Sequence, residues 1–286
     1  MNKHPINAGW WLCIAAALTA LPGTAQKPAP VKSPRLYIFD CGTIKGFDPA
    51  LFQFKKEQLA STDMVVPCYL VAHPKGVLLW DAGVIPDSAF KTGGAPVSQP
   101  LLMATSTVTK PLLSQMAAAG YRPADVTYVA FSHYHSDHVA NANVFAGSTW
   151  LVHKSERDAM FAAKPEDQAA YSQLKNSKTL ILPNSDYDVF GDQSVVIKYA
   201  PGHTPGHQVL FLNLPQTGKI LIAGDLWHYP EERGSGKVPP IETSKEQTLA
   251  SRAAMENLLM QTGAQLWVEH DMPTYNKLKK APAYYE

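Results

Sequence analysis

The feature that most constrains this chain is the segment His133-Tyr134-His135-Ser136-Asp137-His138, which directly follows an apolar, β-branched run at 126–131. Such a run is typical of a buried strand. Imidazole and carboxylate side chains crowded at the end of a core strand would be costly to bury without partners. Together they suit zinc or a similar first-row divalent ion. The segment therefore predicts a metal site, with a solvated polar loop as the alternative.

Three further segments have the same arrangement, in which ligand-type residues come just after an apolar strand. Ala200-Pro201-Gly202-His203-Thr204-Pro205-Gly206-His207 follows a strand expected at 195–200, Gly224-Asp225 follows one at 219–223, and His270-Asp271 follows one at 266–269. Taken singly, each of these residues would be an ordinary loop residue. If the strands share a sheet, the side chains converge on one edge, which indicates a single shared site.

The remaining elements complete an α/β or α+β layered pattern. Further strands are expected at 36–39, 64–72, 76–81, 149–153 and 209–213, and helices at 112–119, 155–163 and 245–262. Ser155 and Ser244 are the predicted caps of the last two helices, and Gly263 is predicted to end the third. The stretches 84–110 and 228–243 are rich in proline and glycine and are predicted to be irregular, the first as a lid.

The full motif set resembles the metallo-β-lactamase-fold hydrolases. It consists of H-x-H-x-D-H, a later histidine in Pro-Gly-His-Thr-Pro-Gly-His, then Gly-Asp, and a final histidine at a strand end. The resemblance covers about residues 36–286 and implies a four-layer αββα sandwich of two similar halves, with the metal site at one sheet edge. Three segments are similar, more narrowly, to the N-acyl-homoserine lactone lactonases: Val66-Pro67-Cys68-Tyr69-Leu70, Gly120-Tyr121-Arg122-Pro123-Ala124-Asp125-Val126, and 199–211.

The resemblance also implies a dinuclear metal site. Its expected ligands are His133, His135 and His203 for one ion, Asp137, His138 and His270 for the other, and Asp225 for both. Zinc is the first expectation for both ions, with Co²⁺, Mn²⁺ and Fe²⁺ as alternatives. Asp81 is implied to support the histidine loop from behind, and His207 is expected to support the loop of His203 without binding an ion.

Two ions a few ångström apart can lower the pKa of a bound water to about 7, which produces a hydroxide that attacks a carbonyl or phosphoryl centre. Asp137 is expected to orient this nucleophile and to pass a proton to the leaving group. The chain contains no G-x-S-x-G segment, in keeping with a reaction that needs no serine nucleophile.

The first functional expectation is a hydrolase of lactone or ester bonds, with N-acyl-homoserine lactones as the leading substrate and quorum quenching as the activity. Within the predicted lid, Phe90, Leu101, Leu102 and Met103 are candidate acyl-chain contacts, with plain core packing as the alternative. The partner is thus a small molecule. Oligomeric state is left open.

Other functions compete with this one. A secreted metallo-β-lactamase fits export, but lactamases that share H-x-H-x-D-H generally lack an aspartate at the position of Asp225. An organophosphate or aryl-ester hydrolase shares the full ligand set. A thioesterase of the glyoxalase II type is disfavoured because that family adds a helical domain after the last ligand, and only 16 residues follow His270 here. A binding module without catalysis is disfavoured by the complete ligand set.

The chain departs from the lactonases that it resembles at one position. Those enzymes generally carry a tyrosine three residues after the bridging aspartate, where its hydroxyl can contact the substrate carbonyl. Here that residue is His228, and Tyr229 comes one residue later. Successive side chains of an extended segment point opposite ways, so His228 is expected to be the donor. Two alternatives are that the loop bulges and Tyr229 donates, or that both side chains pack the loop.

The N-terminus predicts export. Lys3 precedes a short apolar run at 10–18, and small residues precede Gln26, which is typical of a signal peptide at 1–25. Residues 26–35 are expected to form an extended leader and residues 36–286 one metallo-β-lactamase-fold domain. The apolar run is shorter than the ~20 residues of a spanning helix, with an uncleaved anchor as the alternative. The mature protein is expected to be periplasmic or secreted, without a stable membrane anchor.

Charge and cysteine content add two expectations. Lys and Arg number 25 and Asp and Glu 24, for a net charge of +1, so there is no electrostatic case for binding nucleic acid. After cleavage only Cys41 and Cys68 would remain. An oxidising compartment would allow them to pair, but two separate thiols are the prediction because disulfide geometry is demanding.

Overall fold

The computed structural model describes Met1 and residues 29–91, 93–101 and 103–286. The predicted signal peptide, apart from Met1, and the first residues of the leader lie outside the described residues. Within the described part of the chain, no helix is long and apolar enough to cross a membrane.

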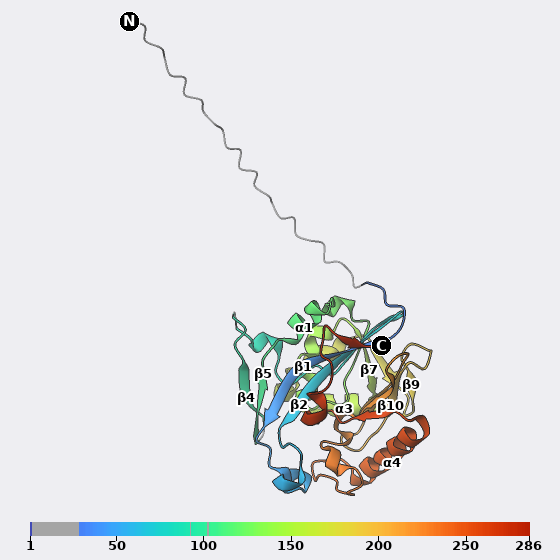
Figure 1. Cartoon of the computed structure of the whole chain (residues 1–286). Coiled ribbons are helices and arrows are strands. Elements are labelled where there is room, and N and C mark those ends of the chain that lie inside the picture. Colours follow the sequence, from blue (N-terminus) through green and yellow to red (C-terminus); the bar gives the residue numbers. More distant parts are fainter. Residues whose placement is uncertain (2–28, 92, 102) are drawn as a thin grey trace.

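Two β-sheets form the centre of the molecule (Figure 1). Among the described residues, the larger sheet has nine strands in the order β4-β5-β1-β2-β3-β6-β7-β8, with β14 also paired to β1. Their bounds are β1 Arg35–Lys45, β2 Met64–His73, β3 Gly76–Trp80, β4 Val97–Leu101, β5 Ala104–Val108, β6 Tyr128–Ala130, β7 Thr149–His153, β8 Thr179–Leu182 and β14 Tyr284–Tyr285.

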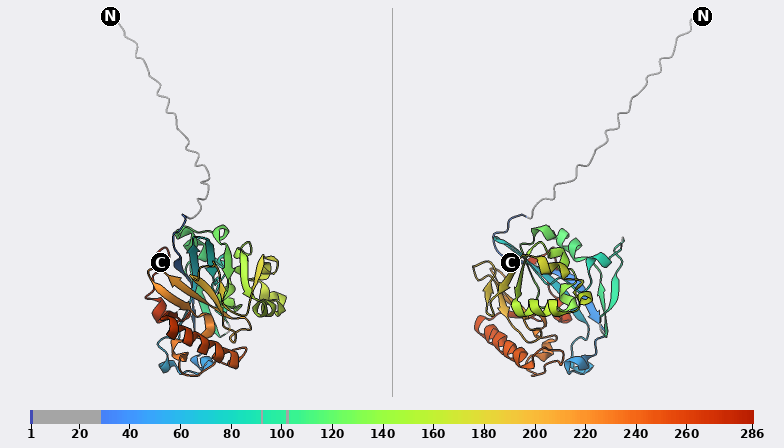
Figure 2. Two further views of the ribbon diagram at one scale, coloured as in Figure 1. Left: turned by 90° about the vertical axis from the view of Figure 1, so that its right-hand side faces the viewer. Right: turned by 180° about the vertical axis from the view of Figure 1, so that it is seen from behind.

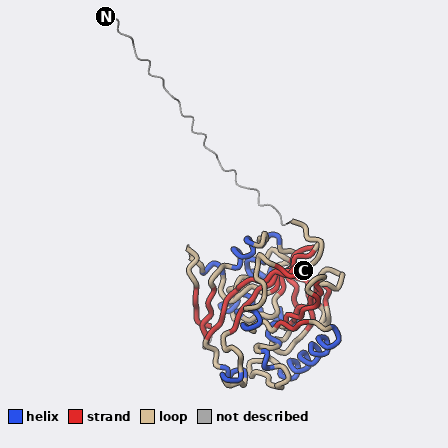
Figure 3. Tube along the Cα trace, in the orientation of Figure 1, coloured by secondary structure: helices blue, strands red, loops and turns tan. Residues whose placement is uncertain are grey.

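The smaller sheet has the order β13-β12-β11-β10-β9. Its strands are β9 Tyr187–Asp188, β10 Val195–Tyr199, β11 Gln208–Leu214, β12 Gly218–Ile222 and β13 Gln265–Trp267. The helices are α1 Leu112–Ala118, α2 Ser136–Val139, α3 Lys154–Ala162, α4 Lys245–Thr262 and α5 Met272–Tyr275. Figure 3 shows how helices and strands are distributed, and α4 lies on the outside of the molecule in each view of Figures 1 and 2.

Alternating side chains build the layers, since successive residues of a strand face opposite sides of its sheet. In β1, Ile38 belongs to the core between the sheets, whereas Phe39 joins a second core with Leu112 of α1 and Met160 of α3. In β12, Ile222 joins the core between the sheets. Its neighbour Leu221 joins a third core that includes Met255 and Leu259 of α4. The predicted αββα sandwich is confirmed.

Strand direction explains why the candidate site residues lie at one edge of each sheet. β3 and β6 are parallel, and so are β12 and β13. The carboxyl ends of these strands therefore point the same way within each sheet. Asp81 follows β3, His133 follows β6, Asp225 follows β12 and His270 follows β13.

Helix α4 matches its prediction. The Ser244 hydroxyl accepts a hydrogen bond from Gln247 N, and Gly263 ends the helix at φ 66°. The predicted cap of α3 is wrong, because His153 is the N-cap residue and the Ser155 hydroxyl donates to Pro205 O at 2.9 Å.

The prediction that 84–110 is irregular is also wrong. Strands β4 and β5 pair as an antiparallel hairpin there, at the edge of the larger sheet. Several of its side chains are exposed and polar, so the hairpin lacks the apolar alternation that marks a half-buried strand. Pro100 is tolerated because an edge strand has unpaired backbone groups on one side.

The cysteines correct a further expectation. Cys41 and Cys68 form a disulfide, with their Cα atoms 5.8 Å apart, whereas two separate thiols were predicted. The register of β1 against β2 shifts between Asp40 and Thr43. Both side chains lie in the same core, on the α1 side of the larger sheet.

Candidate metal centre

The first candidate ion site combines three histidines and one carboxylate: His133, His135, His203 and Asp225. The Nε2 atom of His203 lies 3.1 Å from His133 Nε2 and 3.0 Å from His135 Nδ1. Asp225 Oδ2 lies 3.4 Å from His203 Nε2 and 3.7 Å from His133 Nε2. The structure thus brings together the residues that the resemblance assigned to one ion.

The second candidate site consists of Asp137, His138, Asp225 and His270. Asp225 Oδ1 lies 3.0 Å from His270 Nε2 and 3.3 Å from His138 Nε2. Asp137 Oδ2 lies 3.6 Å from His138 Nε2 and 3.7 Å from His270 Nε2. Each oxygen of Asp225 therefore faces a different group, as a bridging carboxylate requires.

These residues fit divalent metal ions. Bonds of 2.0–2.1 Å in a tetrahedral site place neighbouring ligand atoms about 3.3 Å apart, and the separations here are close to that value. Among the described residues, His138 Nε2 and Asp225 Oδ1 are buried without a hydrogen-bond partner. Burial lowers the pKa of both His133 and His203 well below its usual range. Both rings are therefore neutral, and each has one nitrogen without a proton that can bind a metal ion.

The carboxyl group of Asp225 is ionised, as metal binding requires. Burial opposes its ionisation, but the imidazoles of His270 and His138 hold the pKa of Asp225 well below its usual range. Together with the imidazole groups of the neighbouring histidines, this ionised carboxylate forms a donor set suited to borderline ions such as zinc.

Groups behind the ligands fix the orientation of their rings. His138 Nδ1 lies 3.1 Å from Asp81 Oδ2, and Ser132 N donates to Asp81 Oδ1 at 2.7 Å. His270 Nδ1 donates to Val65 O at 2.7 Å. A partner at Nδ1 leaves Nε2 as the atom that faces an ion. Asp81 has a left-handed φ of 59°, a conformation that is uncommon outside glycine, so its two contacts hold a strained residue in place.

His203 has an equivalent partner that the sequence did not indicate. Its Nδ1 lies 2.9 Å from Glu242 Oε1. Glu242 lies in the loop predicted at 228–243, where no motif marks it. His207 Nδ1 donates to Ala200 O at 3.0 Å, and its Nε2 accepts from Asp225 N at 3.1 Å. Because both of its nitrogens have partners, His207 supports the backbone of Asp225 and is not placed as a ligand.

Both candidate sites open on a cavity of about 610 Å³. Its polar floor is formed by His135, Asp137, His203, Asp225, His228 and His270, and its apolar walls by Phe47, Leu51, Phe52, Met64, Pro100, Leu101, Met103 and Ile241. Of the predicted acyl-chain contacts, Leu101 and Met103 line this cavity. Phe90 packs against the core on the α1 side, and Leu102 lies outside the described residues.

The two candidate donors differ in position. His228 lines the cavity, with Nε2 3.5 Å from Asp225 Oδ2 and Nδ1 3.3 Å from Glu232 Oε1. The Tyr229 hydroxyl instead donates to Thr62 O at 3.4 Å, and its ring packs against Phe52. Among the described residues that line the cavity, His228 is present and Tyr229 is not.

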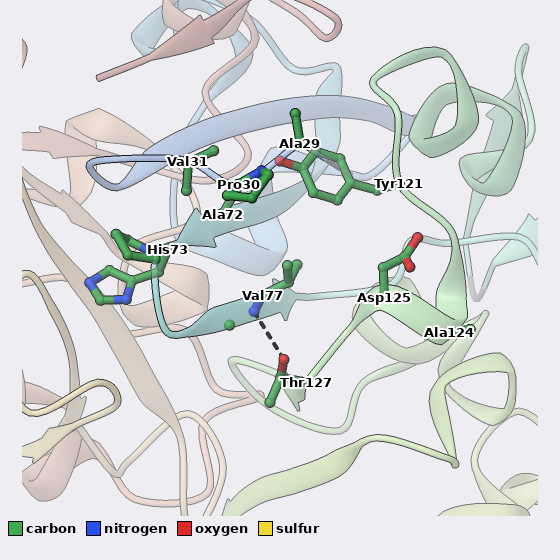
Figure 4. Close-up of a pocket in the computed structure, with 12 residues that line it drawn as sticks. Ala29, Pro30, Val31, Ala72, His73, Val77, Tyr121, Ala124, Asp125 and Thr127 are labelled. Atoms are coloured by element: carbon green, nitrogen blue, oxygen red, sulfur yellow. Dashed lines mark hydrogen bonds between the residues drawn. The ribbon is translucent and has the colours of Figure 1, made fainter. Parts of the chain in front are cut away.

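A second hollow, of about 480 Å³, lies beside the turn that joins the end of β2 to the start of β3 (Figure 4). Thr127 Oγ1 accepts a hydrogen bond from Val77 N at 3.1 Å there, and His73 Nε2 pairs with Asp192 at 2.9 Å. In the described part of the chain, no metal-binding group includes a residue of this hollow.

Comparison with known proteins agrees with this geometry. The family model described as the Metallo-beta-lactamase superfamily matches residues 61–259. N-acyl homoserine lactonase AttM of Azorhizobium caulinodans is 30% identical over 270 residues, which cover 88% of this chain and 98% of the relative. N-acyl homoserine lactonase AiiA of Bacillus thuringiensis subsp. kurstaki is 27% identical over 230 residues, or 78% of this chain and 87% of that protein.

A similar solved structure is that of an N-acyl homoserine lactone hydrolase with the product N-hexanoyl-L-homoserine at its catalytic metal center. It covers 89% of this chain and 100% of its own, with a TM-score of 0.73 at 23% identity. At that identity the likeness concerns the fold. The family match, the relatives and the converging ligand groups together show that this chain is a metal-dependent hydrolase of the metallo-β-lactamase superfamily.

Proposed function

We propose that the protein is an exported N-acyl-homoserine lactone lactonase that works with two divalent ions, zinc first. The observation that carries this proposal is the cavity, whose floor holds two ligand groups joined by Asp225 and whose walls are apolar. A polar lactone ring at the floor and an apolar acyl chain along the walls match this division. The names of the relatives AttM and AiiA support the same substrate class.

The proposed ligands are His133, His135 and His203 for one ion, Asp137, His138 and His270 for the other, and Asp225 for both. Bound there, the ions would supply Lewis acidity toward the lactone carbonyl and would acidify the attacking water. Asp137 lines the cavity beside His138 and His270. In this proposal its carboxylate orients the attacking water by accepting a hydrogen bond from it, takes up the proton that the water releases, and passes that proton to the leaving alcohol.

His228 is the proposed donor to the carbonyl oxygen as negative charge develops on it. Burial opposes its protonation, but Glu232 raises the pKa of His228 to about 9. The ring then carries a proton on Nε2, which has no hydrogen-bond partner among the described residues, while Nδ1 lies 3.3 Å from Glu232 Oε1. The apolar side chains around the donor lower the local dielectric constant, which strengthens this interaction.

Export is proposed on two grounds. The N-terminal pattern is typical of a signal peptide, and the Cys41–Cys68 disulfide fits a compartment in which disulfides persist. Mass spectrometry of protein from the native cell envelope should find a chain that starts at or near Gln26. An intact Met1 terminus in a membrane fraction would favour an anchor.

The substrate class is tested by comparing kcat/KM for an N-acyl-homoserine lactone, a cephalosporin and an aryl phosphotriester on one metal-loaded preparation. The lactone should be turned over fastest. Faster turnover of the cephalosporin would favour a metallo-β-lactamase, and faster turnover of the phosphotriester an organophosphate hydrolase. Elemental analysis of the same preparation should find two ions per chain, and well under one ion would contradict the dinuclear site.

The apolar wall has its own test. Each acyl methylene that Met103 helps to bury should contribute ~0.8 kcal/mol, so kcat/KM should rise up to about fourfold per methylene. Met103→Ser should flatten this dependence on chain length. Met260→Ser is the matched control, because Met260 is exposed on α4 and does not line the cavity. Equal slopes in the two variants would place the acyl chain elsewhere.

A further inference from the structure

Glu156 is a buried carboxylate that contacts two of the ligand loops. It lies in the first turn of α3 and is 3% exposed. Its Oε1 accepts a hydrogen bond from Tyr134 N at 2.9 Å, and its Oε2 accepts one from Gly206 N at 2.8 Å. The Thr204 hydroxyl donates to the same carboxylate, at 2.8 and 2.9 Å from its two oxygens.

The donors are distributed in a way that points to the first ligand group. Tyr134 stands between His133 and His135, and Thr204 follows His203. One side chain therefore joins the two loops that carry all three histidines of that group. These loops are about 70 residues apart in the chain, as the spacing of His133 and His203 shows.

The contact to Gly206 extends this link to the bridging carboxylate. Gly206 is followed by His207, whose Nε2 accepts from Asp225 N at 3.1 Å. The approach of this loop to α3 is close. A Cβ added at Gly206 would lie 2.6 Å from both Glu156 Cβ and Glu156 N. Only glycine permits this spacing, so the contact is built into the backbone of the loop.

The second ligand group is held by other residues. His138 pairs with Asp81 and His270 donates to Val65 O. Within the described part of the chain, the hydrogen bonds of the Glu156 carboxylate go to Tyr134, Thr204 and Gly206 and not to the segments of Asp81 or Val65. A role in helix capping does not account for Glu156 either, because α3 has neither a side-chain cap nor a capping box.

We propose that Glu156 is a positioning residue that sets the spacing of His133, His135 and His203. It thereby raises the metal affinity of the first ion site more than that of the second. This inference rests on the proposed ligand assignment and not on the identity of the substrate. The Glu156 carboxylate acts by accepting hydrogen bonds from the backbone N–H groups of both loops. A neutral isostere that replaces one acceptor oxygen with an N–H donor must therefore push one loop away.

Glu156→Gln is the direct test. The amide group keeps the shape of the side chain but presents N–H to one of the present donors. Changes in groups behind the ligands typically cost 10–100-fold in metal affinity. Chelator competition with Zn²⁺ should therefore show one ion bound 10–100-fold more weakly and the other weakened by a smaller factor, because Glu156 reaches the second group only through the shared loop and Asp225. Burial raises the pKa of Glu156 to about 7, so the titration is run at about pH 8.5, where the carboxyl is ionised.

His203→Ala identifies which ion is lost, because it removes a ligand of the first group alone. The Co²⁺ absorption spectrum of Glu156→Gln, loaded with one equivalent, should match that of His203→Ala. Asp158→Asn is the matched control, since it removes the same charge from the same helix at a side chain that is 55% exposed. Its two Zn²⁺ affinities should equal those of the wild type.

Thr204→Val provides a second variant if Glu156→Gln does not fold. It removes one donor and keeps the shape, so it should weaken the same ion by less than Glu156→Gln is expected to. Equal weakening of both ions, or none, would overturn the proposal. So would a lower melting temperature of the metal-free protein with both affinities unchanged, which would mark a structural role only. Absence of lactone turnover in the fully loaded wild type would refute the lactonase proposal and leave this result standing.

Discussion

Removing the Cys41–Cys68 disulfide should measurably destabilise the protein. The bridge closes a loop with a sequence separation of 27 residues. In the chain-entropy model, closing a loop of that length stabilises the folded state by about 3.5 kcal/mol, by restricting the unfolded chain. Both cysteines are buried in the core on the α1 side, so replacing them with alanine also removes some packing. The figure is therefore a lower value for the double variant Cys41→Ala/Cys68→Ala.

The assay is thermal unfolding of the metal-free mature protein under oxidising conditions. For a domain of this size, 1 kcal/mol corresponds to roughly 2–4 °C in melting temperature, so the double variant should melt roughly 7–14 °C below the wild type. Wild-type protein that has been unfolded, reduced and refolded in reductant should have the same melting temperature as the double variant. Reductant should not change the melting temperature of the double variant.

Two results would refute this reasoning. One is a melting temperature for the double variant within about 2 °C of the oxidised wild type, which corresponds to under 1 kcal/mol. The other is the recovery of two free thiols per mature chain after denaturation without reductant, which would mean that the bridge does not form. Either result would also remove the disulfide as support for export.

Three further predictions concern the site and its surroundings. Asp225→Ala should lose both ions and activity by metal analysis and turnover, and His207→Ala should be far milder; equal metal loss in both would mean that the roles of these residues are misassigned. His228→Ala should lower kcat about 100- to 1000-fold and Tyr229→Phe only a few-fold, and the reverse ranking in steady-state kinetics would return the donor role to Tyr229. Burial lowers the pKa of His153 from 6.5 to about 4. Its contribution to stability is therefore complete above pH 6.5 and is lost as the pH falls toward 4, by about 3 kcal/mol. Urea unfolding of the metal-free protein should show this loss, and a His153→Leu variant with the same pH slope would contradict it.

The positions of the expected ligands were predictable because two independent signals coincide at them. Apolar runs mark strands, and the polar residues that interrupt them mark strand ends, so His133, Asp225 and His270 could be placed on one edge before any contact was known. Their residue types then restricted the chemistry. The structure adds the distances, which show that Asp225 lies between the two groups.

The residues that hold the ligands were not predictable in the same way. Glu242 and Glu156 are single carboxylates without a motif, and their partners lie 39 and 22–50 residues away in the chain. A lone glutamate in a loop or a helical first turn is normally solvated. Only the tertiary fold shows that both are buried against ligand loops. The polar hairpin β4–β5 was missed for a related reason, since neither of its faces is continuously apolar.

His228 belongs to this buried network as much as to the cavity. Three histidines at the site have a carboxylate at Nδ1, in the pairs His138–Asp81, His203–Glu242 and His228–Glu232. His138 and His203 are expected ligands. His228 has the same kind of carboxylate support, although the resemblance leads one to expect a tyrosine at its position. Glu232 is in turn paired with the buried Arg252, which also donates to Leu226 O at 2.7 Å. A phenol at position 228 could not donate to Glu232 from the ring position of Nδ1. The buried Glu232 Oε1 would then keep the bond from the backbone N of residue 228, at 3.3 Å, and lose the one from the ring, and the loss of a buried hydrogen bond is costly. The histidine and its glutamate are therefore best understood as one unit, in which Glu232 sets the direction of Nε2 and α4, through Arg252, holds Glu232.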